Sequence, residues 1–467
     1  MYAVFLASDP QFNGRFFTGV LTTGIYCLPS CKARKPKREN IRFFITTEQA
    51  RAAGMRPCRK CHPDDFARGA DPVLESIEEL VGEMRTSPTA FSDTASLVRR
   101  SGFGATRLFE LFRLHYHTTP ADVLLRARLA IAKEHLLHGS KPLSSLAYDS
   151  GFEALSSFHE NFRRLNGLTP AVYRELPLAS RFELVLPPDY SVPYLRRALS
   201  RDAHSANERL EGDVYATVFD SARGPALLKM TLSPARMKAE FPVGTGVDAH
   251  RLVVRLLGLE QDAVGFIKQV KRLGLARLFA GRPGLRLAQT HSIFDGLLWS
   301  VIGQQINFPF ACQLKRRLVE RAGRPFGNGL FALPSPDAVA DLSRTKLLEL
   351  QFSNQKADYL LGIARLVVER KLDLTRLGET SATRAERTLL NVRGLGPWAV
   401  NYVMMRALGF PDCVPLGDTG VSSGLKALLK LEERPDIDSV RRLTAIFAPY
   451  RSLATAHLWQ FNQPLPL

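Results

Sequence analysis

The sequence has no long hydrophobic run, no cationic leader segment and few cysteines. Charged residues interrupt its apolar stretches well before the roughly 18 residues that a membrane span needs. The first ten residues, MYAVFLASDP, lack the cationic segment that opens a secretory signal. Only 6 of the 467 residues are Cys. We therefore expect a cytoplasmic protein with no membrane partner, in which clustered cysteines bind metal more readily than they form disulfides.

Acidic residues are scarce relative to basic ones. The chain has 63 Lys and Arg against 45 Asp and Glu, a formal net charge of +18. Such an excess favours an acidic partner, most simply nucleic acid. A merely basic protein without that partner is the alternative. The length and the 45% hydrophobic content suit several globular domains.

Four of the cysteines form two close pairs in a C-x3-C-x26-C-x2-C pattern, Cys27 and Cys31 followed by Cys58 and Cys61. Two close pairs that are far apart in the chain are typical of a tetrahedral Zn²⁺ site. A zinc ion that only holds a small fold together is the structural alternative. Cys312 and Cys413 stand alone and are expected to be packing residues.

The first cysteine pair is followed by a cationic stretch. Residues 31–42, CKARKPKRENIR, contain six cations and one Glu. A zinc ion with four thiolates carries two net negative charges, which a DNA phosphate repels unless cations compensate. If one thiolate took a methyl group from a methylated phosphate, the sulfur would become a neutral thioether and the repulsion would fall. The pattern thus suggests a thiolate that both repairs DNA and gains affinity for it.

The segments TTGIYCLPSCKARKPKRENIRFF and AAGMRPCRKCHPD closely resemble the N-terminal domain of Ada adaptive-response proteins, over about residues 1–70. The resemblance implies that Cys27 accepts methyl from phosphotriesters and that the methylated protein activates transcription. Cys31, Cys58 and Cys61 would complete the zinc site. The implied DNA contacts are Thr23, Arg34, Arg56 and also Lys32, which stands where the family usually has Arg.

Two segments about 50 residues apart repeat one pattern. SGFGATRLFELFRLHYHTTPADV begins at Ser101, and SGFEALSSFHENFRRLNGLTPAVY begins at Ser150. Each predicts a helix, a Gly turn and a second helix, with a connecting helix that starts near Pro120. A plain helical bundle is the alternative. The region resembles AraC-type DNA-binding domains. The candidates for its recognition faces are Arg107, Ser156, Ser157, His159, Arg163 and Arg164.

The hydrophobic pattern changes after the second repeat. Residues 182–240 alternate like strands, as in RFELVLP, DVYATVF and ALLKMTL, and helices are expected from there to the end. Within LLNVRGLGPWAVNYVMMRALG, Gly394 and Gly396 predict a tight hairpin between two helices, whose backbone N–H groups can bind a phosphate. Asp418 follows Gly396 by 22 residues. It is a candidate catalytic carboxylate, and a helix N-cap is the alternative.

The motifs GRPGLRL, VIGQQI, GLGPWAVNY and RSLATAHLW resemble AlkA-type 3-methyladenine DNA glycosylases across about residues 181–467. The resemblance implies that Asp418 acts on a flipped base. Trp398 stands where bifunctional relatives have Lys, which implies a monofunctional enzyme. Trp398, Tyr402 and Trp459 match the aromatic pocket, with core packing as the alternative, and Gln305 occupies the position of a leucine wedge. The chain lacks a Pro-Cys-His-Arg motif, so we expect no repair of O6-methylguanine.

The sequence therefore predicts a multidomain, mainly α protein with α+β parts. The expected domains are a zinc-binding methyl acceptor (1–76), an AraC-type double helix-turn-helix (77–180), an AlkA-like β-rich domain (181–288) and a helix-hairpin-helix glycosylase domain (289–467). The expected partner is double-stranded DNA, either alkylated or at promoter sites. The protein itself is expected to be a bacterial, nucleoid-associated monomer with Zn²⁺ as its cofactor. The alternative is a transcription regulator whose C-terminal half only binds DNA.

Overall fold

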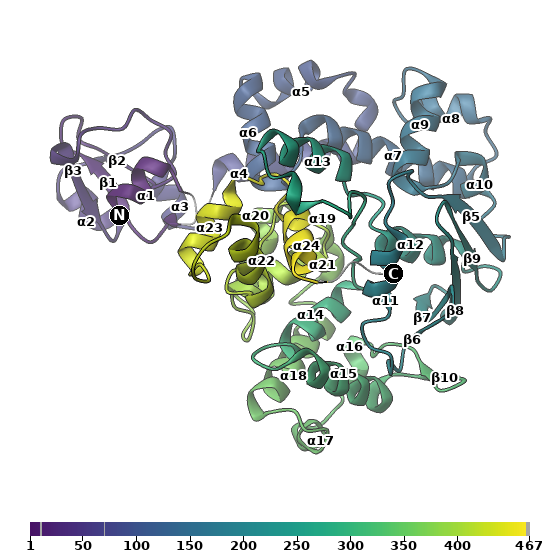
Figure 1. Ribbon diagram of the computed structural model, residues 1–467. Helices are drawn as coiled ribbons and strands as arrows, with labels where there is room; N and C mark the ends of the chain where they lie inside the picture. The colour runs from purple at the N-terminus through teal and green to yellow at the C-terminus, as the bar shows by residue number, and fades with distance from the viewer. Residues whose placement is uncertain (10–11, 70, 464–467) are drawn as a thin grey trace. The chain divides into compact units, whose positions relative to one another are not determined.

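The computed structural model describes residues 1–9, 12–69 and 71–463 (Figure 1). It consists of two compact units. The first comprises Met1–Glu83 with Arg100–Gly102, and the second comprises Met84–Arg99 with Phe103–Leu467. Within the described ranges, no helix combines the length and apolarity that crossing a membrane requires.

A four-stranded sheet organises the first unit, in the order β3-β1-β2-β4. Strand β1 pairs antiparallel with β2 and with β3, whereas β2 and β4 are parallel. Its core is small, and the buried Asp64 accepts hydrogen bonds from Tyr26 and Arg51. These bonds tie the middle of β2 to the following helices. The elements are α1 (Tyr2–Ala7), β1 (Phe17–Val20), β2 (Ile25–Cys27), β3 (Ile41–Phe44), α2 (Thr47–Ala52), β4 (Arg56–Pro57) and α3 (Pro63–Ala67).

The predicted sequence repeat is confirmed as two helix pairs joined by one long helix. Each Thr-Pro motif begins a helix, because the hydroxyl of Thr119 or Thr169 accepts a backbone N–H and the following Pro occupies the first helical position. The first pair is α5 and α6, the second is α8 and α9, and α7 connects them. The helices are α4 (Pro72–Thr86), α5 (Thr94–Ser101), α6 (Ala105–Tyr116), α7 (Pro120–His138), α8 (Leu143–Asp149), α9 (Leu155–Asn166) and α10 (Pro170–Arg174).

An antiparallel five-stranded sheet follows, in the order β5-β9-β8-β7-β6. The predicted strands at 182–240 are confirmed, but that span also contains a helix, α11, which the prediction missed. Its apolar residues recur at helical spacing, and Pro193 lies in its first turn. This helical signal is short, and the alternating pattern of the neighbouring strands is stronger. The elements are β5 (Arg181–Val185), α11 (Val192–Leu199), β6 (Glu208–Glu211), β7 (Val214–Ser221), β8 (Gly224–Leu232), β9 (Arg236–Glu240), α12 (Gly246–Leu257) and α13 (Ala263–Arg272).

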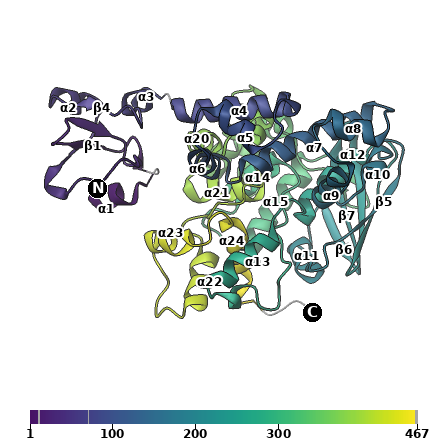
Figure 2. The ribbon, with the colours of Figure 1, turned by 90° about the horizontal axis from the view of Figure 1, so that it is seen from above.

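The second helix pair shares one hydrophobic core with this sheet. Phe158, Phe162 and Tyr173 belong to the same buried cluster as Phe182 and Tyr215. Figure 1 and Figure 2 both place α9 and α10 beside the sheet and α12. The helix-turn-helix and the β-rich segment are therefore one packed body, and cutting the chain between them would expose apolar surface from both.

A buried histidine lies in that shared core. His250 is 2% exposed, its ring meets those of Tyr173 and Phe182, and its Nε2 donates to the carbonyl of Asn166 at 2.7 Å. Burial lowers the pKa of His250 to about 3. Its unfolded pKa is about 6.5, so the unfolded chain binds the extra proton first. The stability that this histidine contributes is present above pH 6.5 and is lost as the pH falls toward 3.

We expect His250→Gln to flatten the acid loss of stability, since glutamine can still donate to Asn166 but does not titrate. Between pH 6 and pH 4, the free energy of unfolding of the variant should fall less steeply, by up to about 1.4 kcal/mol per pH unit. Denaturant unfolding at each pH measures this slope. His159→Gln is the control, because His159 lies on the half-exposed side of α9. Equal slopes for the wild type and His250→Gln would contradict the prediction.

The remainder of the chain is helical, as predicted, except for one short hairpin. Strands β10 and β11 pair through Asn328 and Gly329, whose φ values of 51° and 70° suit a tight hairpin turn. The elements are α14 (Ile293–Ile302), α15 (Phe308–Ala322), β10 (Pro325–Gly327), β11 (Leu330–Phe331), α16 (Pro336–Ala340), α17 (Arg344–Glu349), α18 (Asn354–Val368), α19 (Leu374–Glu379), α20 (Ala382–Leu390), α21 (Pro397–Arg406), α22 (Thr419–Leu429), α23 (Ile437–Ala445) and α24 (Arg451–Phe461).

Two hydrophobic clusters form the core of this helical part. One contains much of α14, α18 and α21, and the other contains much of α22 and α24. Trp459 packs against both clusters. The junction between the clusters is where the loops before α21 and α22 meet α24.

Candidate functional site

The four paired cysteines converge at one edge of the first unit's sheet. Cys27 ends β2 and Cys58 directly follows β4, and parallel neighbours leave a sheet at the same edge. Turns after the two strands bring Cys31 and Cys61 back, so that all four sulfur atoms lie within 4.8 Å of one another. Four thiols in this arrangement fit Zn²⁺, which prefers tetrahedral sulfur ligands.

The backbone distinguishes the four sulfurs. Leu28 N donates to Cys61 Sγ at 3.4 Å, Lys60 N donates to Cys58 Sγ at 3.4 Å, and the backbone at Ala33 donates to Cys31. In the described ranges no hydrogen bond to the Cys27 sulfur is found besides those of its fellow cysteines. A donated N–H stabilises a thiolate and weakens it as a nucleophile. Cys27 is therefore the most electron-rich of the four ligands, although Cys61 is more exposed and Cys27 is only 5% exposed.

Cations surround the thiol cluster. Lys35 Nζ donates to the carbonyl of Cys31 at 2.6 Å and lies 4.0 Å from the centre of the Phe5 ring. Burial lowers the pKa of Lys35. The four DNA-contact residues implied by the resemblance all have exposed side chains on this unit: Thr23, Lys32, Arg34 and Arg56.

Removing the metal is expected to unfold the first unit and to leave the second unit folded. The small core of the first unit cannot easily replace a structural zinc site, whose binding free energy is on the order of 10 kcal/mol. Hydrogen exchange followed by peptide mass spectrometry, before and after chelation, locates the loss of protection. We expect it between residues 12 and 69, with residues 104–463 unchanged. Cys312→Ala is the control, because that cysteine lies outside the cluster and should leave the zinc content unchanged. Unchanged protection of 12–69 in the metal-free protein would contradict the prediction.

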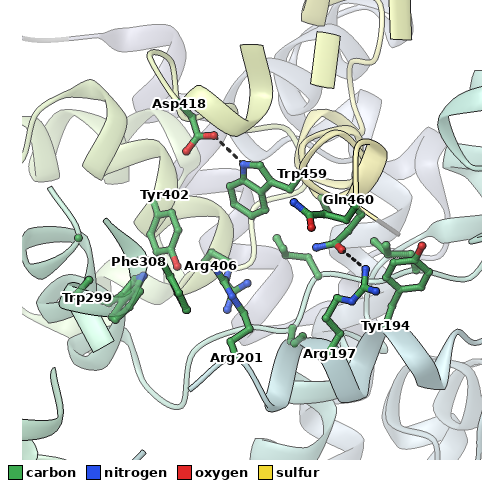
Figure 3. A pocket seen from close by; sticks show the side chains of 18 of the residues that line it. Tyr194, Arg197, Arg201, Trp299, Phe308, Tyr402, Arg406, Asp418, Trp459 and Gln460 are labelled. Atoms are coloured by element: carbon green, nitrogen blue, oxygen red, sulfur yellow. Dashed lines mark hydrogen bonds between the residues drawn. The ribbon is translucent and has the colours of Figure 1, made fainter. Parts of the chain in front are cut away.

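The second site is a pocket of 470 Å³ at the junction of the two helical clusters (Figure 3). One face of α21, the end of α24, the start of α22 and the helices α11, α14 and α15 contribute to its walls. Its labelled lining residues are Tyr194, Arg197, Arg201, Trp299, Phe308, Tyr402, Arg406, Asp418, Trp459 and Gln460. A volume of this size suits a small organic ligand or a part of a larger one.

Asp418 is held in this pocket by three N–H donors. Its Oδ1 accepts from Val421 N at 3.0 Å and from Trp459 Nε1 at 2.9 Å, and its Oδ2 accepts from Trp398 Nε1 at 3.2 Å. The bond to Val421 makes Asp418 the N-cap of α22. The N-cap expected as the alternative is thus confirmed, and the same carboxylate lines the pocket, where its catalytic role stays a prediction. Figure 3 shows the carboxylate pointing toward the ring of Trp459.

The three aromatic residues named from the sequence come together around this carboxylate. Trp398 and Tyr402 stack with ring centres 5.5 Å apart, and Tyr402 lies 6.4 Å from Trp459. All three line the pocket. Trp398 and Trp459 also pack against the hydrophobic clusters, and Tyr402 is buried. These side chains thus line the pocket and are also held in place by packing, as a rigid binding surface requires.

Sequence reasoning missed the arginines of the pocket. Arg197 lies on α11 and Arg201 follows that helix, whereas Arg406 is the last residue of α21. Arg286, from the segment between α13 and α14, also lines the pocket. The Arg201 guanidinium lies 4.2 Å from the centre of the Phe308 ring. Burial lowers the pKa of Arg201. The only signal in the sequence was the RRALSR stretch, which lay in a segment interpreted as strands.

Gln305 and the hairpin glycines Gly394 and Gly396 are not among the residues that line the pocket. Gln305 is exposed, with a φ of 56°, in the loop between α14 and α15, and it is absent from the pocket lining. Gly394 has a φ of 98°, and an added Cβ would meet the Tyr359 ring at 2.4 Å. This glycine is required by both its backbone and its neighbour. Gly396 precedes α21 as its N-cap.

The structure also places the predicted recognition residues on helix surfaces. Arg107 on α6 is exposed and pairs with Glu110 at 3.3 Å. On α9, the side chains of Ser156, Ser157, Arg163 and Arg164 are exposed and that of His159 is half-buried. The sequence pattern predicts that the phenylalanines of the repeat are core residues. This is confirmed for Phe112, Phe152, Phe158 and Phe162, which are buried, but it is wrong for Phe109, which is 45% exposed on α6.

Three family models match the chain. Residues 1–64 match the metal binding domain of Ada, residues 97–176 match a helix-turn-helix domain, and residues 298–449 match the HhH-GPD superfamily of base excision DNA repair proteins. The DNA-3-methyladenine glycosylase of Bacillus subtilis is 33% identical over 206 residues, which are 43% of this chain and 68% of that protein. The chain belongs to the DNA-3-methyladenine glycosylases.

This glycosylase also carries Ada and helix-turn-helix segments, and one relative has the same extent. A probable bifunctional transcriptional activator/DNA repair enzyme AlkA of Mycobacterium tuberculosis is 26% identical over 98% of this chain and 95% of that protein. In structure, the glycosylase resembles the 3-methyladenine DNA-glycosylase of Archaeoglobus fulgidus. The TM-score is 0.54 at 21% identity, over 60% of this chain and 98% of that one. The predicted multidomain fold is confirmed.

Proposed function

We propose that the second unit hydrolyses the N-glycosidic bond of alkylated bases such as 3-methyladenine, in the manner of DNA-3-methyladenine glycosylase II. The observation that carries the proposal is the carboxylate of Asp418, fixed by three N–H donors inside an aromatic pocket. A carboxylate in that position stabilises the positive charge that develops on the sugar as the bond to the base breaks. It also orients the water that attacks the sugar carbon, so that the products are a free base and an abasic site.

The surrounding residues supply binding rather than covalent chemistry. The faces of Trp398, Tyr402 and Trp459 attract a base that alkylation has made cationic. Since Trp398 has no amine, the hairpin supplies no nucleophile for a Schiff base there, and the reaction is monofunctional. The backbone at Gly394 and Gly396 binds a DNA phosphate. The pocket arginines would bind the phosphates that flank the flipped nucleotide.

The first unit would accept a methyl group from a methylphosphotriester. Cys27 Sγ attacks the methyl carbon, a new S–C bond forms, the C–O bond breaks, and the phosphate leaves as an anionic diester. Bound Zn²⁺ would keep the thiols deprotonated. Since the Cys27 sulfur becomes a neutral thioether and is not regenerated, each chain reacts once. Thr23, Lys32, Arg34 and Arg56 would then bind the backbone more tightly, because the centre has lost one negative charge.

We propose that the chain has four domains, 1–76, 77–180, 181–288 and 289–467, and that it acts as a monomer at the bacterial nucleoid. The helix-turn-helix would read promoter sequences through Arg107 on α6 and through Ser156, Ser157, His159, Arg163 and Arg164 on α9. The shared core across residue 180 supports a reader and a glycosylase that move together. The second candidate function is a regulator whose C-terminal half only holds DNA.

Base release separates the two candidates. Purified protein is incubated with methylated duplex DNA, and free 3-methyladenine is measured by chromatography. We expect release that is proportional to the enzyme added, together with alkali-labile abasic sites in the DNA. Binding of the same duplex without release of any base would leave only the holding function.

A further inference from the structure

The loop that carries Gln305 has an unusual anchor. Lys356, in the first turn of α18, donates from Nζ to Val301 O at 3.0 Å, to Ile302 O at 2.6 Å and to Gln304 O at 2.8 Å. An ammonium has three N–H donors, so these contacts use all of them. Val301 and Ile302 end α14, where helix carbonyls lack helical partners and carry partial negative charge. The cation thus closes the helix end and fixes the start of the loop.

The same turn of α18 also fixes the hairpin. The ring of Tyr359, one turn after Lys356, covers Gly394. Gln304 then links the two elements, because its Nε2 donates to the carbonyl of Gly394 at 2.9 Å. The loop and the hairpin are therefore held at one spacing by a single helix turn, and Gln305, the residue after Gln304, is exposed.

We propose that Lys356 is a positioning residue for base flipping, one that holds Gln305 ready to fill the space that the extruded base leaves. The proposal rests on the proposed glycosylase function. A non-glycine residue at a φ of 56° is disfavoured on its own, so the loop needs outside contacts to keep Gln305 in that conformation. The three carbonyl contacts supply them. A wedge that is already in place avoids ordering the loop during flipping.

Burial of Lys356 supports the same conclusion. Lys356 is half-buried, and desolvation lowers the pKa of its ammonium to about 8. A methionine of similar length would not carry this electrostatic penalty. What the ammonium adds over an apolar side chain is the set of three N–H donors that hold the loop.

The test compares a lesion in a base pair, which the enzyme must unpair and unstack, with a lesion that is already unpaired. A single 7-methylguanine is placed either in a fully paired duplex or in a one-base bulge, where the base is already poorly stacked. Single-turnover release is measured for the wild type, Lys356→Met, Lys356→Arg and Gln305→Ala. Lys346→Met is the matched control, since Lys346 is an exposed lysine on α17 that pairs with Glu349.

We expect Lys356→Met to slow release from the paired duplex roughly ten-fold, which corresponds to about 1.4 kcal/mol of barrier, and to leave release from the bulge nearly unchanged. Gln305→Ala should show the same pattern, and the double variant should lose little more than either single one. Lys356→Arg should retain most of the activity, because a guanidinium can also donate to carbonyls. Lys346→Met should match the wild type.

Equal slowing on both substrates would overturn the proposal, because a general structural defect does not distinguish them. Unchanged release from the paired duplex would overturn it as well. If Lys356→Met does not fold, Lys356→Gln carries the same comparison, with the two N–H donors of an amide in place of three. A wild type that releases neither 7-methylguanine from these substrates nor 3-methyladenine from methylated duplex DNA would overturn the glycosylase itself, a result that differs from every outcome above.

Discussion

Asp418→Asn abolishes base release and leaves DNA binding intact: this is the result we expect from the largest single change to the pocket. The substitution removes the negative charge that faces the sugar, and we expect single-turnover release to fall on the order of 10³-fold. Asparagine is also a good N-cap, so its carbonyl can still accept from Val421 N and the start of α22 should persist. Chromatography of the freed base and a gel-shift titration on the same duplex measure the two effects.

Asp436→Asn is the matched control. Asp436 caps α23 as Asp418 caps α22, with Ser439 N donating to its carboxylate at 2.8 Å, but it does not line the pocket. Its substitution tests the loss of a capping charge without touching the proposed chemistry, and release should stay within about two-fold of the wild type. If Asp418→Asn kept most of the activity, the carboxylate would be a cap and nothing more.

The second large effect concerns methyl transfer. Wild-type protein incubated with duplex DNA that contains methylphosphotriesters should gain one methyl group per chain, located on Cys27 by fragment sequencing in the mass spectrometer. Cys27→Ala should gain none. The physical reason is the backbone: N–H groups stabilise the sulfurs of Cys31, Cys58 and Cys61, whereas Cys27 is left the better nucleophile.

Cys61→Ala is the informative control, because it also removes one metal ligand and Cys61 is the most exposed of the four. If its zinc content is retained, it should still transfer a methyl group to Cys27. If solvent exposure selected the methyl acceptor, it would be Cys61, whereas nucleophilicity selects Cys27. Methylation of Cys61 in the wild type would show that access, and not electron density, selects the acceptor.

The features that the sequence predicted well are those encoded by residues near one another in the chain. The thiol pairs, the two Thr-Pro helix starts and the Gly394–Gly396 hairpin each depend on a few adjacent residues whose conformation is decided locally. Asp418 was found by its distance from the hairpin, and its capping role is equally local. Local backbone preferences and ligand spacing suffice for such features.

The features that the sequence left undecided depend on distant segments meeting. The sequence analysis did not predict the helix α11 or the short hairpin of β10 and β11. Both have local signals, but the segments around them show a stronger strand or helix pattern. The arginines of the pocket could not be assigned at all, since nothing local to Arg201 indicates that it meets Phe308, which lies about a hundred residues further on.

By itself, the sequence determined which chemical groups this protein has: four thiols for a metal, a carboxylate after the hairpin, aromatic faces and an excess of cations for DNA. Only the tertiary structure decided how these groups are held. It placed two indole donors and one backbone donor on Asp418, let one core serve both the reader and the sheet, and put Lys356 against two carbonyls at the end of α14 and one in the loop that follows. The physical reason is that residue type sets which bonds a group can make, whereas packing between distant segments sets which of those bonds are made.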